Sequence, residues 1–233
     1  MAVEMAAFFT ELLDGFLKPD FLKTVHKKFH YGEEQLETLM AVAGEMLPII
    51  RKEAFWERGA ERSYGGEQGE PGMVCEEVVM SLGKGLDDLQ EDYSRKGMLL
   101  ESYMLETLAS ELLLRGYSAY NQYVRMEGKW HVARYHFPGS KEELPLESLP
   151  EILEGLSPQV VCNKAFCMQP KKSVVFIAEL TQDATRVCEG ICIGCGSADC
   201  PNRVKTDSPE GQLGARSMDM PLSYGYSRIF GRF

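Results

Sequence analysis

Four cysteines close together near the end of the chain are the residues whose type and spacing point most directly to chemistry. They are Cys188, Cys192, Cys195 and Cys200, which lie within thirteen consecutive residues of a Gly-rich stretch. Thiolates this close in sequence can converge on one centre, and in a reducing compartment such a group typically binds a metal. The sequence therefore predicts a metal or cluster site here, with disulfides inside the segment as the alternative.

The spacing of these four thiols leaves two kinds of site open. Four-cysteine zinc sites usually combine two separated pairs of cysteines, whereas all four thiols are local here. A local run that closes with Cys200-Pro201 is closer to the runs that hold iron–sulfur clusters, so we favour iron–sulfur over zinc. The other three cysteines, Cys75, Cys162 and Cys167, are interpreted as structural thiols.

The elements that must position these residues mix helix and strand without regular alternation. Apolar residues recur at helical spacing, while short β-branched runs and a Gly-rich stretch interrupt them. We expect helices over 5–17, 33–58 (with a kink or break at Pro48) and 149–156, and over 86–113 either one long helix or two helices broken at Gly97. We also expect a loop over 58–72, strands over 74–82, 160–166 and 173–180, and a β-hairpin over 120–137 turning at Glu127-Gly128. This order predicts an α+β fold with a mostly antiparallel sheet flanked by helices.

Three regions follow from this pattern. Residues 1–72 form an N-terminal helical region that ends in the Gly-rich loop, and residues 73–183 form the α+β core. Residues 184–233 are poor in periodicity and rich in Gly, Pro, Ser and Cys. We interpret this last region as an irregular Cys-rich tail organised by the metal or cluster that its cysteines bind.

Composition excludes several classes of function. The 233 residues include 35 acidic and 25 basic side chains, a net charge of −10, which argues against nucleic acid or an anionic membrane as a partner. No apolar run approaches the roughly 18 residues of a membrane span, and the first residues lack a basic segment, so we expect a cytoplasmic protein. The sequence also lacks the P-loop, the Rossmann fingerprint and the nucleophile elbow.

Three ordered segments resemble a known family. They are residues 105–112 (LETLASEL), residues 134–139 (RYHFPG, followed by LPLESLPEIL) and residues 166–174 (FCMQPKKSV). They are similar to the acidic helix, the Arg-x-x-Pro-Gly-Tyr turn and the Met-x-Pro-x-x-Ser-Val strand entry of the reactivation domain of cobalamin-dependent methionine synthase, which also exists as small stand-alone proteins. The resemblance covers about residues 74–180 and implies a twisted antiparallel sheet.

The resemblance also implies a function. The family domain binds S-adenosylmethionine, docks over the corrinoid of a methyltransferase and permits reductive methylation of cobalt that has been oxidised by accident. By resemblance, Arg134 holds the carboxylate of the ligand, Glu106 holds its amino group, and Pro138 and Gly139 form the adjoining turn. The expected partners are a corrinoid-carrying methyltransferase, with methionine synthase as the first candidate, and an electron donor.

Departures from the family pattern support an alternative. One extra residue separates Arg134 from Pro138, and Ser140 stands where the family has Tyr. The alternative is therefore a docking or electron-transfer module with an iron–sulfur cluster or zinc that no longer binds S-adenosylmethionine. Some stand-alone relatives carry a tail ending in Cys-Pro-x-Arg, as residues 200–203 do here, and a cluster in this tail would deliver an electron to the oxidised cobalt. Whether the protein is itself an enzyme stays open.

Overall fold

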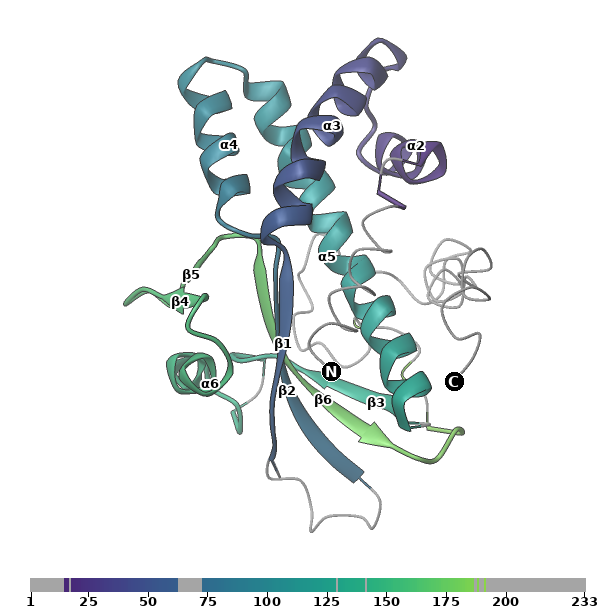
Figure 1. Ribbon diagram of the computed structural model, residues 1–233, viewed down its shortest axis with the longest axis vertical. Coiled ribbons are helices and arrows are strands. Elements are labelled where there is room, and N and C mark those ends of the chain that lie inside the picture. Colours follow the sequence, from purple (N-terminus) through teal and green to yellow (C-terminus); the bar gives the residue numbers. More distant parts are fainter. Residues whose placement is uncertain are drawn as a thin grey trace, which may run out of the picture.

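The computed structural model describes residues 15–16, 18–62, 73–128, 130–140, 142–186, 188 and 191 (Figure 1). Within these ranges an antiparallel sheet is flanked by helices, which confirms the expected α+β fold. Figure 1 shows the strands fanning out from top to bottom, as strands of a twisted sheet do. The helix expected over 5–17 lies almost entirely outside the described residues.

The main sheet has four strands, and each neighbouring pair is antiparallel. Its order is β1 (Phe55–Arg62), β2 (Met73–Ser81), β6 (Ser173–Thr181) and β3 (His131–His136). The two β-branched runs expected as strands over 74–82 and 173–180 form its centre, which confirms them. Because β1 extends to Arg62, the prediction of a loop over 58–72 was wrong for its first five residues, and the rest lies outside the described residues. A separate hairpin pairs β4 (Val161–Cys162) with β5 (Met168–Gln169).

The helices form a bundle at one end of the sheet and cover both of its faces. They are α2 (Pro19–Lys28), α3 (Leu36–Glu53), α4 (Gly85–Arg95), α5 (Leu99–Gly128) and α6 (Leu149–Leu156), with 3-10 turns at Glu33–Gln35 and Leu146–Ser148. Helix α5 has 30 residues, so it is about 45 Å long and extends from the bundle across one sheet face. Figure 1 shows α6 on the opposite side of the sheet.

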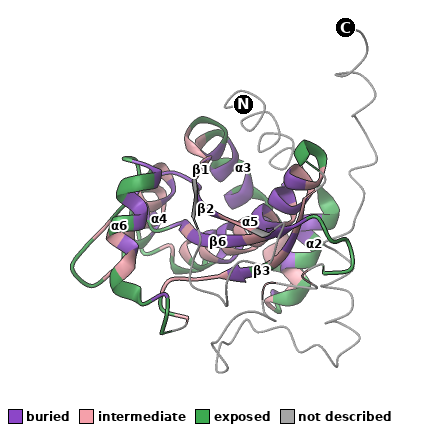
Figure 2. Ribbon diagram, turned by 90° about the horizontal axis from the view of Figure 1, so that it is seen from below, coloured by how far each residue is buried: buried purple, intermediate pink, exposed green. Residues whose placement is uncertain are grey.

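Three hydrophobic cores hold these layers together. The first fills the bundle of α2, α3, α4 and the first half of α5. The second lies between α5 and the sheet and is mainly aromatic, with Tyr117, Tyr120 and Tyr135 around Phe176 at ring-centroid distances of 5.0–5.3 Å. The third lies under α6, on the other face. Figure 2 shows the sheet strands mostly buried between these layers. Because β1 belongs to this sheet and α3 to the first core, residues 18–62 of the expected N-terminal region pack directly on the α+β core.

Three further predicted elements differ from the structure. The strand expected over 160–166 is limited to Val161–Cys162. The helix expected over 33–58 ends at Glu53, and Pro48 lies inside it without ending it. The hairpin expected over 120–137 was wrong, because α5 continues to Gly128 and only His131–His136 forms a strand. Tyr120 and Val124 favour strands by propensity, but in α5 they lie one turn apart and are buried against the sheet, so tertiary packing overrides the local preference.

The turn between α4 and α5 provides a stability prediction. Gly97 has a φ of +74°, a left-handed conformation that side chains disfavour, although a Cβ there would meet nothing within 4 Å. We expect Gly97→Ala to lower the free energy of unfolding by about 1 kcal/mol in urea denaturation. Gly44→Ala is the control, because Gly44 lies exposed inside α3 with equally open space. That variant should instead be stabilised by about 0.5–1 kcal/mol, so equal effects at both positions would contradict the prediction.

Candidate functional site

A β-bulge in β3 decides which way Arg134 points. Val132 pairs with Leu180 of β6, and Arg134 pairs with Glu179, so Ala133 is an extra residue on β3. As a result Val132 and Tyr135 both face the core under α5, while Arg134 emerges on the opposite face. Bulges commonly redirect a side chain near functional sites.

The bulge groups three side chains, Arg134, His136 and Glu179, which we call the Arg134 site. Residues paired directly across antiparallel strands have Cβ atoms about 5 Å apart, so Arg134 and Glu179 are neighbours. His136 Nε2 hydrogen-bonds Glu179 Oε2 at 3.0 Å, and their side chains are 19% and 17% exposed. Arg134 is exposed, and among the described residues none forms a hydrogen bond or ion pair with its guanidinium.

The electrostatics of the Arg134 site keep its carboxylate ionised. The hydrogen bond from His136 is the main cause that lowers the pKa of Glu179; burial opposes it, and the charges of Arg134 and Arg186 add to the lowering. The site therefore offers one guanidinium that is open to a ligand and one ionised carboxylate beside it. This arrangement is complementary to a ligand that carries a carboxylate and an ammonium close together.

The predicted turn residues Pro138 and Gly139 adjoin this site directly after β3. Gly139 has a φ of +82°, and its N–H donates to the Leu144 carbonyl at 2.8 Å. Ser140 closes the turn, because its N–H donates to the Phe137 carbonyl and its Oγ accepts from the Phe137 N–H. The structure thus brings Arg134, Pro138 and Gly139 into one strand-and-turn unit, and it gives Ser140 a structural role at the family's Tyr position.

Glu106 lies in a different part of the fold. It belongs to the bundle half of α5, where its Oε2 accepts a hydrogen bond from Gln90 at 3.0 Å and forms an ion pair with the buried Lys172. Tyr135, the neighbour of Arg134, instead bonds Tyr117 and Asn121 of α5. Eleven residues separate Glu106 from Tyr117, which is about 16 Å along a helix.

This separation bears on the expected ligand contacts. The carboxylate and amino group of S-adenosylmethionine are attached to one carbon, so the residues that hold them must be neighbours. The structure does not bring Glu106 to Arg134, and the carboxylate that it places there is Glu179. The sequence contained one signal for Glu179, since it is the only charged residue in the apolar run of β6. That signal was missed because the face on which Glu179 lies depends on pairing between strands.

The first cysteine of the predicted metal site lies against the same strand. The Cys188 N–H donates to the Val132 carbonyl at 2.8 Å, and its half-buried side chain packs on the second core near Tyr135. Cys192, Cys195 and Cys200 lie outside the described residues. Among the residues that the structure does describe, no group of three or more side chains suited to a metal is found.

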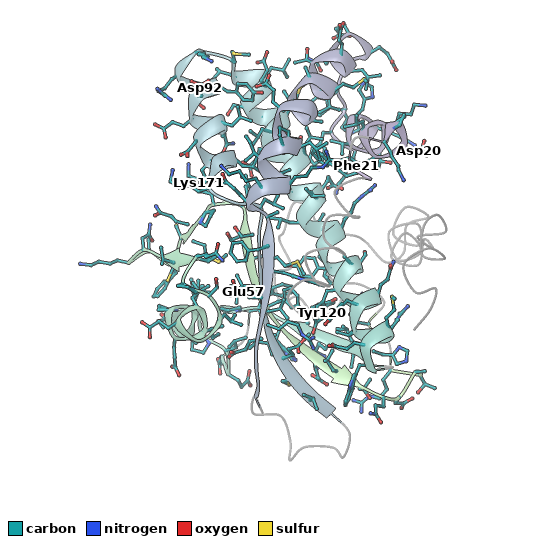
Figure 3. All side chains as sticks on the ribbon, viewed as in Figure 1. Asp20, Phe21, Glu57, Asp92, Tyr120 and Lys171 are labelled. Atoms are coloured by element: carbon teal, nitrogen blue, oxygen red, sulfur yellow. The ribbon has the colours of Figure 1, made fainter. Side chains whose placement is uncertain are left out.

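A second polar cluster lies on the α5 face of the sheet. Arg58 Nε donates to the buried Glu76 at 2.7 Å, and Arg58 Nη1 pairs with Glu127 of α5 at 2.7 Å. Tyr120 points from α5 toward the sheet (Figure 3) and donates to Glu76 at 2.6 Å.

Burial acts to lower the pKa of Arg58, but hydrogen bonds and charges of Glu76 and Glu127 raise it above its ordinary value. Arg58, Glu76 and Glu127, with Trp130 and apolar neighbours, line a pocket of about 300 Å³. Since its charges are mutually paired, we interpret the cluster as a clamp between α5 and the sheet.

No family model matches the chain, and no curated protein matches it significantly. In the described part of the chain, none of the helices is both long and apolar enough to span a membrane. The Arg134 site and the sequence motifs are therefore the features that bear on function.

Proposed function

We propose that this protein is an accessory factor for the reductive reactivation of a corrinoid-dependent methyltransferase, with methionine synthase as the expected client. One observation carries the proposal: the strand that holds the family-like Arg134 motif places an open guanidinium beside the Glu179 carboxylate on one sheet face. The motif of residues 166–174 enters the adjacent strand β6, and the helix motif lies in α5, so all three segments belong to one packed unit.

The residues present fit an S-adenosylmethionine amino-acid moiety. Arg134 would hold the carboxylate through two parallel hydrogen bonds, and Glu179 would accept the ammonium group. When bound, S-adenosylmethionine supplies the methyl group for the cobalt of the partner's corrinoid, after an electron donor has reduced that cobalt. The part of this chain is to bind and orient the donor on an exposed face that a partner can approach.

The test uses the purified full chain. Calorimetry should detect S-adenosylmethionine binding, and the protein should speed the return of an inactive cob(II)alamin methyltransferase to its methylated form when a reductant is supplied. S-adenosylhomocysteine, which lacks the methyl group, is the control for the second measurement, because it should bind without restoring activity. If S-adenosylmethionine does not bind at millimolar concentration and the methyltransferase does not regain its methylated form, the proposal is wrong.

A second candidate function is a docking or electron-transfer module that bears an iron–sulfur cluster or zinc at Cys188, Cys192, Cys195 and Cys200. The specific observation in its favour is the hydrogen bond between Cys188 and Val132, which seats the first of these thiols on the strand that carries Arg134. A cluster bound there would lie beside the same edge strand as Arg134, with Cys188 packed toward the face opposite to Arg134.

The metal site gives a direct prediction. Protein purified without oxygen should contain iron with a visible absorption band, and Cys195→Ser should lose both, because three thiolates hold a four-cysteine cluster poorly. Cys167→Ser is the matched control, since Cys167 is an exposed free thiol in the β4–β5 loop and should leave the spectrum unchanged. Colourless protein with stoichiometric zinc would make the site structural. Wild-type protein without any metal would remove this candidate.

A further inference from the structure

The pocket beside the end of α5 contains more negative than positive charge. Its walls include Glu76, Glu127 and, among the described residues, a single cation, Arg58. Arg58 pairs with the two carboxylates at 2.5 Å and 2.7 Å, but its one positive charge offsets only one of the two negative charges. The pocket also adjoins the C-terminal end of α5, where the helix dipole places partial negative charge. The charges therefore favour a cation as the ligand.

The hydrogen bonds of the two carboxylates narrow the class of cation. The two oxygens of Glu76 accept hydrogen bonds from Arg58 and from Tyr120. Those of Glu127 accept hydrogen bonds from Arg58 and from Tyr123. An ammonium group with N–H donors would compete with these existing donors. A fully alkylated ammonium has no N–H, so it can use the negative charge without displacing any of them.

The indole of Trp130 provides the surface that such a cation needs. It lines the pocket together with three apolar side chains, Val74, Val124 and Leu180. Trp130 is half-buried, and no lysine or arginine in the described part of the chain lies over its ring. The indole packs so closely on the end of α5 that a Cβ on Gly128 would lie 2.5 Å from its Cδ1 atom. Indole faces attract quaternary ammonium groups more strongly than other aromatic side chains do.

We propose that this pocket binds a small quaternary ammonium compound of the chemical class of choline. The alkylated nitrogen would lie against Trp130 beside the Glu127 carboxylate, with its alkyl groups on the apolar walls. The volume of about 300 Å³ is at the lower end of the range for small-molecule sites, which suits a ligand of this size. Because Val124 and Leu180 belong to the second core, the pocket lies on the α5 face of the sheet. Arg134 lies on the opposite face, so this site is independent of the proposed methyl-donor site.

The experiment follows the indole N–H signals of the two tryptophans by NMR while choline is added to the full chain. Trp130→Leu assigns the signals, because it removes one of them. Choline should shift the Trp130 signal until the shift saturates, whereas sodium chloride at the same concentration should give no saturating shift. The neutral isostere 3,3-dimethyl-1-butanol has the shape of choline without its charge. It should bind about tenfold more weakly, since the indole and the carboxylates attract the charge.

Two variants test the two parts of the site. Glu127→Gln removes one negative charge, so the affinity for choline should fall about three- to tenfold while that for the neutral alcohol stays unchanged. Trp130→Leu keeps an apolar wall without the indole face, so choline, followed by the amide signal of Gly128, should lose most of its advantage over the alcohol. Circular dichroism of each variant separates a binding effect from unfolding.

Tyr103→Leu is the matched control, because it replaces an exposed aromatic residue of the same helix by the same side chain. Tyr103 lies 24 residues before Glu127, which is about 36 Å along a helix. This variant should bind choline as the wild type does.

Three results would overturn the proposal. If choline and the neutral alcohol bind equally well, the pocket is an apolar site without preference for a cation. If ammonium chloride binds as tightly as choline, the site does not select an alkylated nitrogen. If the Trp130 signal does not respond to choline at tens of millimolar, the pocket does not bind this class of ligand.

Discussion

Replacing Arg134 by alanine is expected to weaken S-adenosylmethionine binding by about ten- to hundredfold, the range that corresponds to losing charge-assisted hydrogen bonds of about 1.5–3 kcal/mol. The reason is that the exposed guanidinium has no hydrogen-bond or ion-pair partner among the described residues, so its N–H donors are available to a ligand carboxylate. Calorimetric titration at neutral pH checks this value. The melting temperature should change little, because the side chain is exposed.

Two further variants sharpen this prediction. Arg134→Lys keeps the charge but loses the planar fork that matches a carboxylate, so its affinity should fall between those of wild type and Arg134→Ala. Arg95→Ala removes an exposed arginine of α4 whose ion-pair partner among the described residues is Asp92, and it should bind as the wild type does. Wild-type affinity in Arg134→Ala would exclude Arg134 as the carboxylate ligand.

Replacing Arg58 by methionine should destabilise the fold strongly, and more than Gly97→Ala does. Glu76 is buried, with a side chain only 7% exposed, and Arg58 is its only ion-pair partner among the described residues. Removing one partner of a buried ion pair leaves an uncompensated charge, which typically costs about 3–5 kcal/mol. We expect the free energy of unfolding, measured in urea, to fall by that amount.

The double variant Arg58→Met with Glu76→Gln tests the cause. Glutamine carries no charge and still accepts a hydrogen bond from Tyr120, so the double variant should recover more than half of the lost stability. Lys84→Met is the control, because it breaks only an exposed pair with Asp88 and should leave the urea midpoint nearly unchanged. A loss of less than about 1 kcal/mol in Arg58→Met would contradict the prediction, because water or a neighbouring group would then compensate the Glu76 charge without Arg58.

Several elements were correctly predicted from local pattern. In the β-branched runs that form β2 and β6, successive side chains face the second and the third core in turn. The helix expected over 149–156 matches α6. The pattern around Gly97 left open one long helix or two helices broken at this glycine. The structure has two helices, and Gly97 lies between them in a left-handed conformation that glycine adopts freely. The motif that contains Arg134, Pro138 and Gly139 likewise forms one continuous unit of chain.

Other features depended on contacts between distant residues. Tyr120 lies in a helix because its ring packs against Phe176, which is 56 residues later in the chain. Arg134 meets Glu179, 45 residues later, only because the bulge at Ala133 shifts the strand register by one. A one-residue shift exchanges the two faces of a strand, so no local pattern could distinguish Glu179 from Glu106 as the neighbour of Arg134.

The sequence by itself therefore determined the α+β class, the acidic character, the four local cysteines and the motif around Arg134, because each depends on residues that are close along the chain. The tertiary structure decided which carboxylate stands beside that arginine and which histidine holds it. Both depend on strand register, and register is set by the burial of whole faces of the sheet under α5 and α6.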